Sequence, residues 1–382
     1  MMSNLSSLCT YAKGKVSVDT LSKQNYVSTE NMLPNKGGIV DAGGLPSVQY
    51  VQQYIKGDIL VSNIRPYFKK IWMANEDGGC SNDVLVFRAA HGCDSTFLYY
   101  VLSNDAFFNY ASATSKGTKM PRGDKIAIMQ YEVPCFDHET QLRIGKLLRS
   151  IDARITVNKK INDNLEQQAQ SYFQELFVDN ADPEWAIGTI SDLGTVVGGS
   201  TPSKAKPEYY TESGIAWITP KDLSINKSKF VSHGENDITE LGLKNSSAAI
   251  MPEGTVLFSS RAPIGYIAIA AGEVTTNQGF KSVVPKPEIG TPFVYFFLKN
   301  TLPVIEGMAS GSTFKEVSGS TMKNVPAVIP DAETLAKFSD FCAPIFAQQR
   351  ILEEQNQSLA TLRDNLLPKL MSGEIDVSAV QL

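Results

Sequence analysis

The chain contains two copies of one sequence pattern, and this repetition constrains its fold more than any other feature. The segment Gly57–Ser62 (GDILVS) corresponds to Gly254–Ser259 (GTVLFS), 197 residues later. Phe97–Leu102 likewise corresponds to Phe293–Leu298 at an offset of 196. Corresponding segments in constant order at a nearly constant offset indicate a duplicated unit, and two copies indicate duplicated domains and not a solenoid.

Each copy ends in a segment whose mostly apolar positions are spaced alternately by four and three residues. This spacing predicts two long helices that pair as a coiled coil; two amphipathic helices, each packed on its own domain, are the alternative. Asn162 and Asn356 occupy the same seam position, where a buried Asn penalises wrong registers. The seam positions are Ile144, Leu148, Ile151, Ile155, Asn158, Asn162, Leu165, Ala169, Tyr172 and Leu176 in the first copy, and Phe338, Cys342, Ile345, Gln349, Leu352, Asn356, Leu359, Arg363, Leu366 and Leu370 in the second.

The expected helix ends divide the chain into four parts. Pro134 and Pro330 precede the two helices, and Asp137 and Asp331 are suited to cap their N-termini. The fold class is therefore α+β, with two mixed α/β domains that are separated by two long helices. The parts are a first domain (1–135), a first helix (136–182), a second domain (183–330) and a second helix (331–382).

Several classes of protein are excluded by missing motifs. The five cysteines are scattered without a C-x-x-C, and the three histidines lack metal-ligand spacing, so we expect reduced thiols and no metal site. No secretory signal or membrane-length apolar run is present, which predicts a cytoplasmic protein. No phosphate-binding loop, dinucleotide fingerprint or nucleophile elbow occurs, so we do not expect an independent enzyme.

Three motifs in the second copy resemble those of a known family. They are Gly199-Ser200-Thr201-Pro202-Ser203, Arg261-Ala262-Pro263-Ile264-Gly265 and Asn277-Gln278-Gly279-Phe280-Lys281. With both helices, they make the whole chain resemble the specificity subunit of a Type I restriction-modification system. The first copy departs from the pattern, because it lacks the Gly-x-Thr-Pro opening and has Ser81-Asn82 where the second copy has Asn277-Gln278.

The resemblance implies a division of labour between subunits. Each domain would read one half of a bipartite, asymmetric sequence in double-stranded DNA, and the helices would pair antiparallel as a ruler for the spacer. A seam from 144 to 176 is about 48 Å long as a helix, or roughly 14 base-pair steps. Two methyltransferase subunits with S-adenosylmethionine would dock on the helices, and motor-nuclease subunits would supply ATP- and Mg-dependent cleavage. No cofactor is expected on this chain itself.

Candidate DNA contacts fall into two chemical groups. Lysines suit phosphate contacts, whereas planar amide and guanidinium groups suit base edges. Lysines on a solvated surface, and an Asn277-Gln278-Gly279 turn stabilised by its own side chains, are the structural alternatives. The phosphate candidates are Lys13, Lys15, Lys69, Lys70, Lys119, Lys204, Lys206, Lys281 and Lys315, and the base candidates are Asn63, Arg65, Arg261, Asn277 and Gln278.

The charge of the chain leaves other functions open. The net charge of -5 divides into +2 and -1 for the two domains and -2 and -4 for the helices, so the acidity lies mainly in the helices. DNA binding is therefore not excluded, although the chain alone should bind DNA weakly. A bivalent scaffold for protein or glycan, and an independent nuclease, are the competing hypotheses. The target sequence and the modified base cannot be read from these residues.

Overall fold

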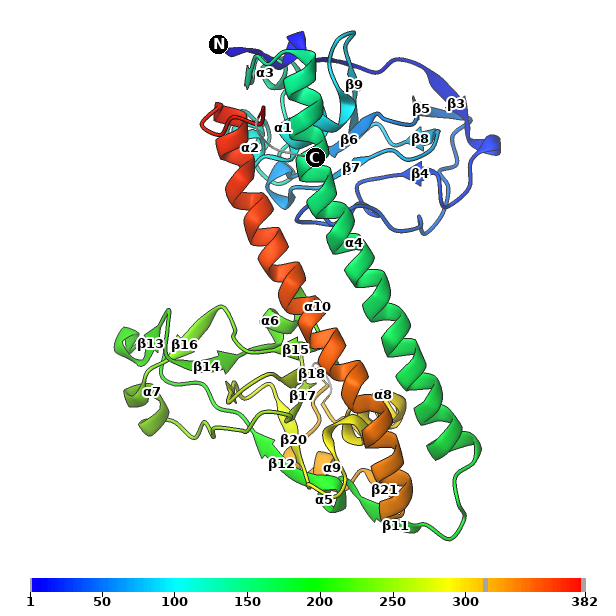
Figure 1. Cartoon of the computed structure of the whole chain (residues 1–382), viewed down its shortest axis with the longest axis vertical. Helices are drawn as coiled ribbons and strands as arrows, with labels where there is room; N and C mark the ends of the chain where they lie inside the picture. Colours follow the sequence, from blue (N-terminus) through cyan, green and yellow to red (C-terminus); the bar gives the residue numbers. More distant parts are fainter. Residues whose placement is uncertain (1, 312–314, 379–382) are drawn as a thin grey trace. The chain divides into compact units, whose positions relative to one another are not determined.

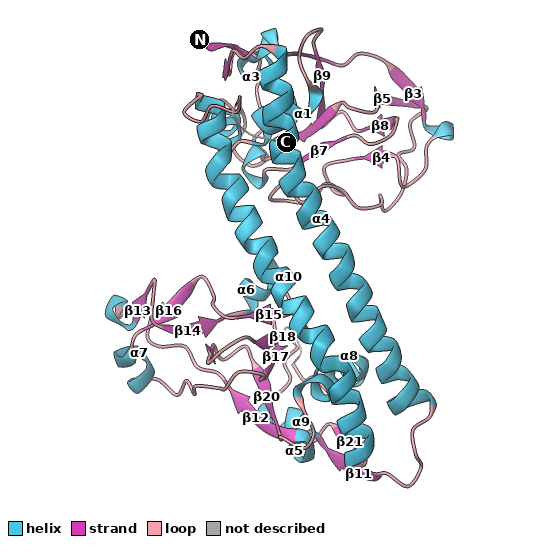
Figure 2. Cartoon of the chain, viewed as in Figure 1, coloured by secondary structure: helices cyan, strands magenta, loops and turns pink. Residues whose placement is uncertain are grey.

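The computed structural model describes residues 2–311 and 315–378 and divides the chain into two compact units. Unit 1 comprises Met1–Ile155 and Gln357–Leu382, and unit 2 comprises Thr156–Asn356. The two long helices, α4 (His138–Gln174) and α10 (Ala332–Ser372), each contribute one end to each unit (Figure 1). Both units combine short strands, short helices and long loops, as Figure 2 shows.

Unit 1 contains two four-stranded sheets and a two-stranded ribbon. The sheets have the strand orders β2-β9-β6-β7 and β3-β5-β8-β4, and the ribbon pairs β1 with β10. The pairings are antiparallel except that of β4 with β8, which is parallel. The elements are β1 (Met2–Asn4), β2 (Cys9–Tyr11), β3 (Lys15–Ser17), β4 (Tyr26–Val27), β5 (Tyr50–Tyr54), β6 (Ile59–Ser62), β7 (Ile71–Met73), β8 (Gly78–Cys80), β9 (Val84–Ala89), α1 (Ser95–Ser103), α2 (Asp105–Ala113), α3 (Lys125–Ile128) and β10 (Glu132–Pro134).

Unit 2 contains a five-stranded sheet, a four-stranded sheet and a ribbon. The orders are β12-β20-β17-β18-β15 and β13-β16-β14-β19, and the ribbon pairs β11 with β21. The elements are β11 (Ala186–Thr189), α5 (Ile190–Leu193), β12 (Gly194–Gly198), β13 (Tyr210–Thr211), β14 (Ile215–Ile218), α6 (Pro220–Ile225), β15 (Phe230–Val231), β16 (Asn236–Ile238), α7 (Glu240–Lys244), β17 (Val256–Ser260), β18 (Ile264–Ala270), β19 (Thr275–Thr276), β20 (Lys281–Pro285), α8 (Thr291–Gly307), α9 (Gly319–Lys323) and β21 (Pro326–Ile329).

Local geometry recurs in the two units at the positions that the sequence repeat pairs. Val27 at the end of β4 accepts a hydrogen bond from the Ser81 amide at 2.9 Å, and Ile218 at the end of β14 accepts one from the Asn277 amide at 3.0 Å. Both acceptors lie on a strand that pairs in parallel with the strand preceding the donor. The units differ in the neighbouring antiparallel strand, because β5 pairs with β8 whereas β16 pairs with β14.

The helix N-termini are capped as the sequence predicts. The Asp137 carboxylate accepts from the Thr140 amide at 2.7 Å, and the Asp331 carboxylate accepts from the Thr334 amide at 2.9 Å. Both carboxylates therefore satisfy backbone donors that the first turn of a helix leaves free. At its other end α4 continues into a π-helical segment, Glu175–Asp179.

Within each unit the two helices contact each other in antiparallel order. In unit 2, the side chains of Asn158 and Asn356 are hydrogen-bonded at 3.0 Å. The rings of Phe173 and Phe338 lie 5.8 Å apart. Residue numbers therefore increase along α4 in the direction in which they decrease along α10. In unit 1, Asp152 pairs with Arg363 at 2.8 Å. The predicted seam residues are all buried or half-buried: Ile144, Leu148, Ile151, Ile155, Asn162, Leu165, Phe338, Cys342, Ile345, Leu352, Asn356 and Leu359.

Each unit builds its core from the domain and both helices together. The unit 1 core joins α1 and α2 to Leu148 of α4 and Leu370 of α10, and the unit 2 core joins α8 to Phe173 of α4 and Phe338 of α10. Because these apolar side chains are removed from water together, each domain is held to a helix pair by the hydrophobic effect. Among the residues that the structure describes, no helix has the length and hydrophobicity that spanning a bilayer requires.

Candidate nucleic-acid interface

The candidate interface of unit 2 is a cluster of loops, which we call loop cluster 2: residues 199–206, 261–264, 277–281 and 315–316. The first and third loops touch, since the Ser200 amide donates to the Thr276 carbonyl at 2.9 Å and Thr201 is hydrogen-bonded to Gln278. A Cβ at Gly199 would lie 2.1 Å from the Asn277 carbonyl oxygen. The chain therefore needs glycine at this position for the two backbones to approach so closely.

Two aromatic side chains hold the first loop, residues 199–206, by hydrogen bonds to its backbone. The Trp217 indole donates to the Ser200 carbonyl at 3.0 Å, and the Tyr210 hydroxyl donates to the Pro202 carbonyl at 2.6 Å. Their rings meet edge to face at 5.7 Å, and Trp217 is 6% exposed. These aromatics hold the loop in place and are not available as platforms for base stacking.

Charges of both signs meet at the centre of loop cluster 2. The Arg261 guanidinium lies 3.4 Å from the Glu316 carboxylate, and both residues line a cavity of about 720 Å³ together with Lys315 and Glu306. Burial lowers the pKa of Lys281, which Glu316 partly offsets and Arg261 reinforces. Arg261 and Lys281 thus both interact with the Glu316 carboxylate, and Lys315 lines the same cavity.

The remaining candidates of unit 2 lie at the edge of this cluster. Lys204 and Lys206 are exposed, and Lys206 is 3.6 Å from Glu208. The Asn277 side chain accepts from the Gly279 amide at 2.8 Å, so the turn alternative is confirmed for this residue, whereas Gln278 is exposed. Residues 312–313 of the polar loop between α8 and α9 lie outside the described residues.

In unit 1 the candidates Asn63 and Arg65 follow strand β6. Asn63 is 7% exposed, and its side-chain amide oxygen (Oδ1) and the Arg65 Nε are buried without a hydrogen-bond partner among the described residues. Arg65 has a φ of 50°, which a non-glycine residue adopts at a cost. In unit 2 Ala262, with a φ of 53°, also lies directly before a proline, so a left-handed residue recurs at this position although the Ala262–Pro263 peptide bond is cis.

The lysine candidates of unit 1 have different environments. Lys69 is 2.8 Å from Asp105, a carboxylate that it shares with Lys36 at 2.9 Å. Lys70 donates to the Thr29 carbonyl at 2.6 Å, and burial lowers its pKa. Lys119 is exposed on the hairpin 116–122 near Arg65. Lys13 and Lys15 are exposed beside strand β3, which belongs to the other sheet, so the contacts do not bring them together with Asn63.

Sequence reasoning missed two charged residues of these loops. Arg122, paired with Asp83 at 3.0 Å, exchanges both backbone hydrogen bonds with Lys116, and Ser310 and Glu316 make the same exchange 194 residues later. Both loops follow the segments Phe97–Leu102 and Phe293–Leu298 that the repeat pairs, and this position in the repeat could have identified Arg122 and Glu316. Their opposite charges distinguish the two candidate surfaces.

Comparisons with known proteins identify the family. A family model described as "Type I restriction modification DNA specificity domain" matches residues 1–167 and 183–362. The MjaIX specificity subunit of Methanocaldococcus jannaschii is 39% identical over 194 residues, which cover 48% of this chain and only 45% of that relative. The HindI specificity subunit of Haemophilus influenzae is 24% identical over 437 residues, covering 92% of this chain and 94% of the relative.

A solved structure has a similar fold. The crystal structure of the S subunit of a Type I restriction-modification system from M. genitalium aligns with a TM-score of 0.61 and 18% identity, covering 97% of this chain and 96% of that one. At this identity the likeness concerns the fold alone. The family model matches both domains and most of their helices, and the chain therefore belongs to the family of Type I restriction-modification DNA specificity proteins.

Proposed function

We propose that the chain is the sequence-reading subunit of a Type I restriction-modification complex, and that each domain recognises one half of a bipartite, asymmetric DNA site. The observation that carries this proposal is that the family model matches two successive ranges, each containing one domain with its candidate contact residues. Two separate readers on one chain suit a target with two separate halves. The chemistry would then belong to partner chains.

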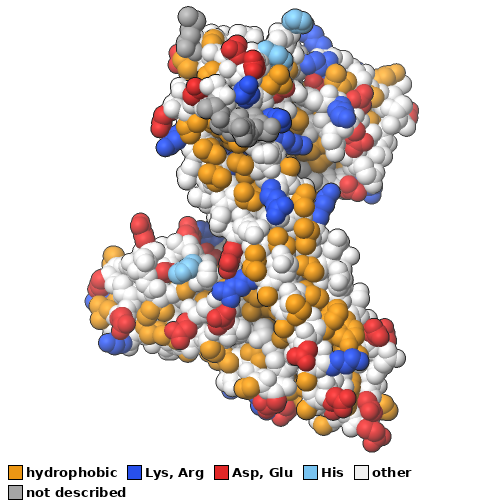
Figure 3. All heavy atoms as spheres, viewed as in Figure 1, with side chains coloured by type: hydrophobic (Ala, Val, Ile, Leu, Met, Phe, Trp, Pro, Cys, Tyr) orange, Lys and Arg blue, Asp and Glu red, His pale blue; other side chains and the backbone are white. Residues whose placement is uncertain are grey.

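Loop cluster 2 and the candidate residues of unit 1 would supply the two kinds of contact that sequence recognition needs, to base edges and to phosphates. In unit 2 the exposed Gln278 and the half-buried Arg261 would contact base edges, whereas Lys204, Lys206, Lys281 and Lys315 would contact phosphates. In unit 1 the exposed candidates are fewer, since Lys69 is paired with Asp105. On the face shown in Figure 3 basic and acidic side chains are interspersed, which fits weak binding of DNA by this chain alone.

The two helices would set the distance between the half-sites. We propose that the domains arose by internal duplication and that α4 and α10 form an antiparallel coiled coil along their shared seam. The antiparallel contacts inside each unit support this arrangement. A rigid seam of about 48 Å would then correspond to roughly 14 base-pair steps of DNA.

Partner subunits would dock on the helices. Several apolar side chains of the helices are exposed in unit 2, including Val157 at 48%, Ile161 at 40% and Ile351 at 47%, and such exposure marks interaction surfaces. We propose that two methyltransferase subunits, which carry S-adenosylmethionine, cover them. Motor-nuclease subunits would add ATP- and Mg-dependent cleavage, so that no cofactor binds to this chain.

A binding experiment tests the proposal. The chain is purified with its methyltransferase partner, and its site is mapped from the methylated bases in cells that carry both. The complex should then bind a duplex containing that gapped site far more tightly than a duplex in which either half is scrambled. Equal affinity for all three duplexes would contradict the proposal, and loss of binding with only one scrambled half would reduce the claim to a single reader.

A further inference from the structure

A buried network of polar side chains joins the sheet domain of unit 2 to both helices. We call it the Glu166 network: Glu166, Lys229, Tyr295, Lys299, Gln349 and Glu353. Lys229, whose side chain is 7% exposed, immediately precedes strand β15. Its ammonium donates to Glu166 of α4 at 2.8 Å and to Gln349 of α10 at 2.9 Å, so one cation of the domain bridges both helices.

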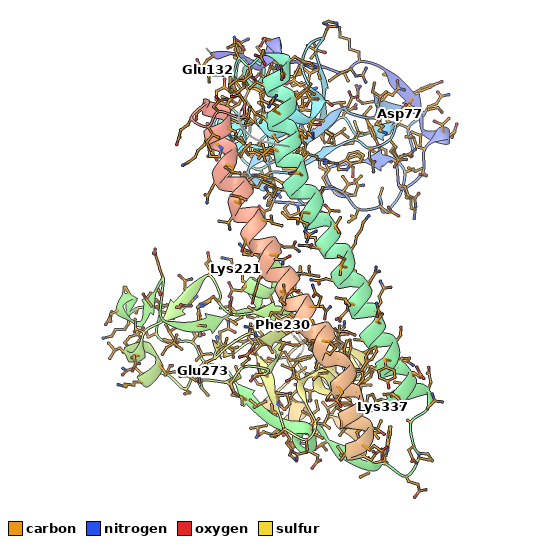
Figure 4. The ribbon with its side chains drawn as sticks, viewed as in Figure 1. Asp77, Glu132, Lys221, Phe230, Glu273 and Lys337 are labelled. Carbon is orange, nitrogen blue, oxygen red and sulfur yellow. The ribbon has the colours of Figure 1, made fainter. Side chains whose placement is uncertain are left out.

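Further hydrogen bonds and an ion pair join the domain of unit 2 to α4 and α10. Glu166 also accepts from the Tyr295 hydroxyl of α8 at 3.1 Å and pairs with Lys299 of the same helix. Glu353 of α10 accepts from the backbone amides of Lys229 and Phe230 at 2.8 and 3.0 Å. Figure 4 shows Phe230 beside α10, at the point where the strand meets the helix. The network therefore constrains the end of β15, α8 and both long helices at once.

The central pair of the network, Glu166 and Lys229, is an ion pair at neutral pH. Burial raises the pKa of Glu166, but Lys229 and Lys299 outweigh burial and lower it to about 2. Burial also lowers the pKa of Lys229, to about 8. The ammonium lies 3.4 Å from the centre of the Phe346 ring, which offers a cation a further favourable contact.

Stability alone is a poor explanation for so many charges at this place. Buried ion pairs contribute little net stability, because desolvation offsets their attraction, and apolar residues can replace them without loss. The neighbouring core of Phe173, Phe293 and Phe338 already holds the domain to the helices. Hydrophobic contacts are not directional, however, whereas hydrogen bonds of fixed geometry define one orientation.

Unit 1 contains a second network of the same kind made of different residues. The Tyr100 hydroxyl of α1 donates to Asp152 of α4 at 2.6 Å, and Arg363 of α10 pairs with the other oxygen of that carboxylate at 2.8 Å. In both units a tyrosine of the domain and a cation therefore converge on one carboxylate of α4. The recurrence of this arrangement with different residues points to a shared requirement for orientation.

We propose that Lys229, Glu166 and Glu353 are positioning residues that fix the orientation of the unit 2 domain on the helix pair and so restrict the complex to one spacer length. This inference rests on the proposed function, because only a two-part DNA site has a spacer. None of the three residues belongs to loop cluster 2. Their loss should change which spacers are accepted and should leave the recognised half-sites unchanged.

The test uses the full chain in complex with its methyltransferase partner. Methylation rates are measured on duplexes with the mapped half-sites and a spacer of natural length, one base pair shorter or one longer. In Lys229→Met the preference for the natural spacer should fall about tenfold, the factor that corresponds to about 1.4 kcal/mol. The matched control is Lys244→Met on α7, whose side chain is 74% exposed beside Glu240, and it should keep the wild-type preference.

A double variant separates orientation from folding. Lys229→Met leaves Glu166 with one cation fewer, whereas Glu166→Gln with Lys229→Met removes both charges of the pair together. A folded variant with an unchanged spacer preference would overturn the inference. Failure of both variants to fold, judged by thermal unfolding, would also reject it, since the network would then serve stability. Wild-type protein without sequence-dependent methylation at any spacer would instead refute the proposed function.

Discussion

Asn158 of α4 donates a hydrogen bond to the side-chain carbonyl of Asn356 of α10, with 3.0 Å between Nδ2 and Oδ1. The sequence repeat makes Asn162 the equivalent of Asn356, but Asn162 faces Gln349 and donates to its backbone carbonyl at 3.4 Å. A parallel pair of equivalent helices would bring equivalent residues together. The antiparallel pair brings together residues from different positions of the repeat.

This register predicts a selective cross-link. When Asn158 and Asn356 are both replaced by cysteine, mild oxidation should join them, because facing seam residues come close enough for a disulfide. The variant with cysteines at Asn162 and Asn356 is the control and should stay unlinked. Peptide mapping by mass spectrometry distinguishes the new bond from any that involves the five native cysteines. A cross-link between positions 162 and 356 in preference to 158 and 356 would contradict the antiparallel register.

Replacing each of two adjacent glycines by alanine should have different effects on stability. Gly199→Ala places a Cβ 2.1 Å from the Asn277 carbonyl oxygen, so we expect it to lower the free energy of unfolding by about 1–3 kcal/mol. Gly198→Ala places a Cβ 4.0 Å from the Lys281 side chain, in ordinary contact, and should change stability little. Urea unfolding of both variants checks the prediction. Equal effects would mean that the close approach of the two loops is not required.

The two kinds of basic residue in loop cluster 2 should differ in their effect on DNA binding. Arg261→Ala should cost about 1–3 kcal/mol on the mapped site and relax discrimination at one base pair. Lys281→Ala should weaken binding to mapped and scrambled duplexes alike, and lower the slope of log affinity against log salt by about 0.9. Titrations of the methyltransferase complex at several salt concentrations separate the two. If Arg261→Ala weakened binding equally to both duplexes, Arg261 would be a phosphate contact.

The acid stability of unit 2 should depend on Glu166. Its pKa of about 2 in the folded state lies below the ordinary value of 4.5, so the unfolded state takes up a proton first as the pH falls. The stabilisation is therefore complete above pH 4.5 and is lost as the pH approaches 2. The difference in unfolding free energy between wild type and Glu166→Gln should shrink by about 3 kcal/mol from pH 5 to pH 2.

Two comparisons keep this measurement specific. Burial raises the pKa of Glu353 and the Glu166 carboxylate raises it further, so both proteins are compared in a Glu353→Gln background, in which position 353 does not titrate. Glu240→Gln, at a side chain that is 81% exposed, should give a nearly constant difference over the same pH range. A constant difference for Glu166→Gln as well would show that its carboxylate is not held ionised by the lysines.

The sequence predicted the features of the fold that follow from local pattern. The helix caps at Asp137 and Asp331 are confirmed, and the predicted seam residues are buried or half-buried. Seam spacing identifies which residues point toward a partner helix but not which of them face each other, because both helix directions satisfy the same spacing. The pairing of Asn158 with Asn356 therefore required the structure.

The candidate site was less predictable, because the availability of a charge depends on tertiary contacts. Lys69 has the same side chain as Lys119, but it forms an ion pair with Asp105 of α2, which lies 36 positions further along the chain. Lys229 was not singled out, since a lysine in a sequence usually indicates solvated surface. Only the three-dimensional fold brings Glu166 and Gln349 to it, from 63 positions before and 120 positions after it.

The sharing of helices between the units has a consequence for the order of synthesis. Unit 2 is one uninterrupted segment, Thr156–Asn356, whereas the core of unit 1 includes Leu367, Leu370 and Val377. During translation the core of unit 1 therefore cannot close until these residues have been made, long after the strands that they cover. A stop codon after residue 356 would leave the first domain without part of its core, while every residue of unit 2 would be present.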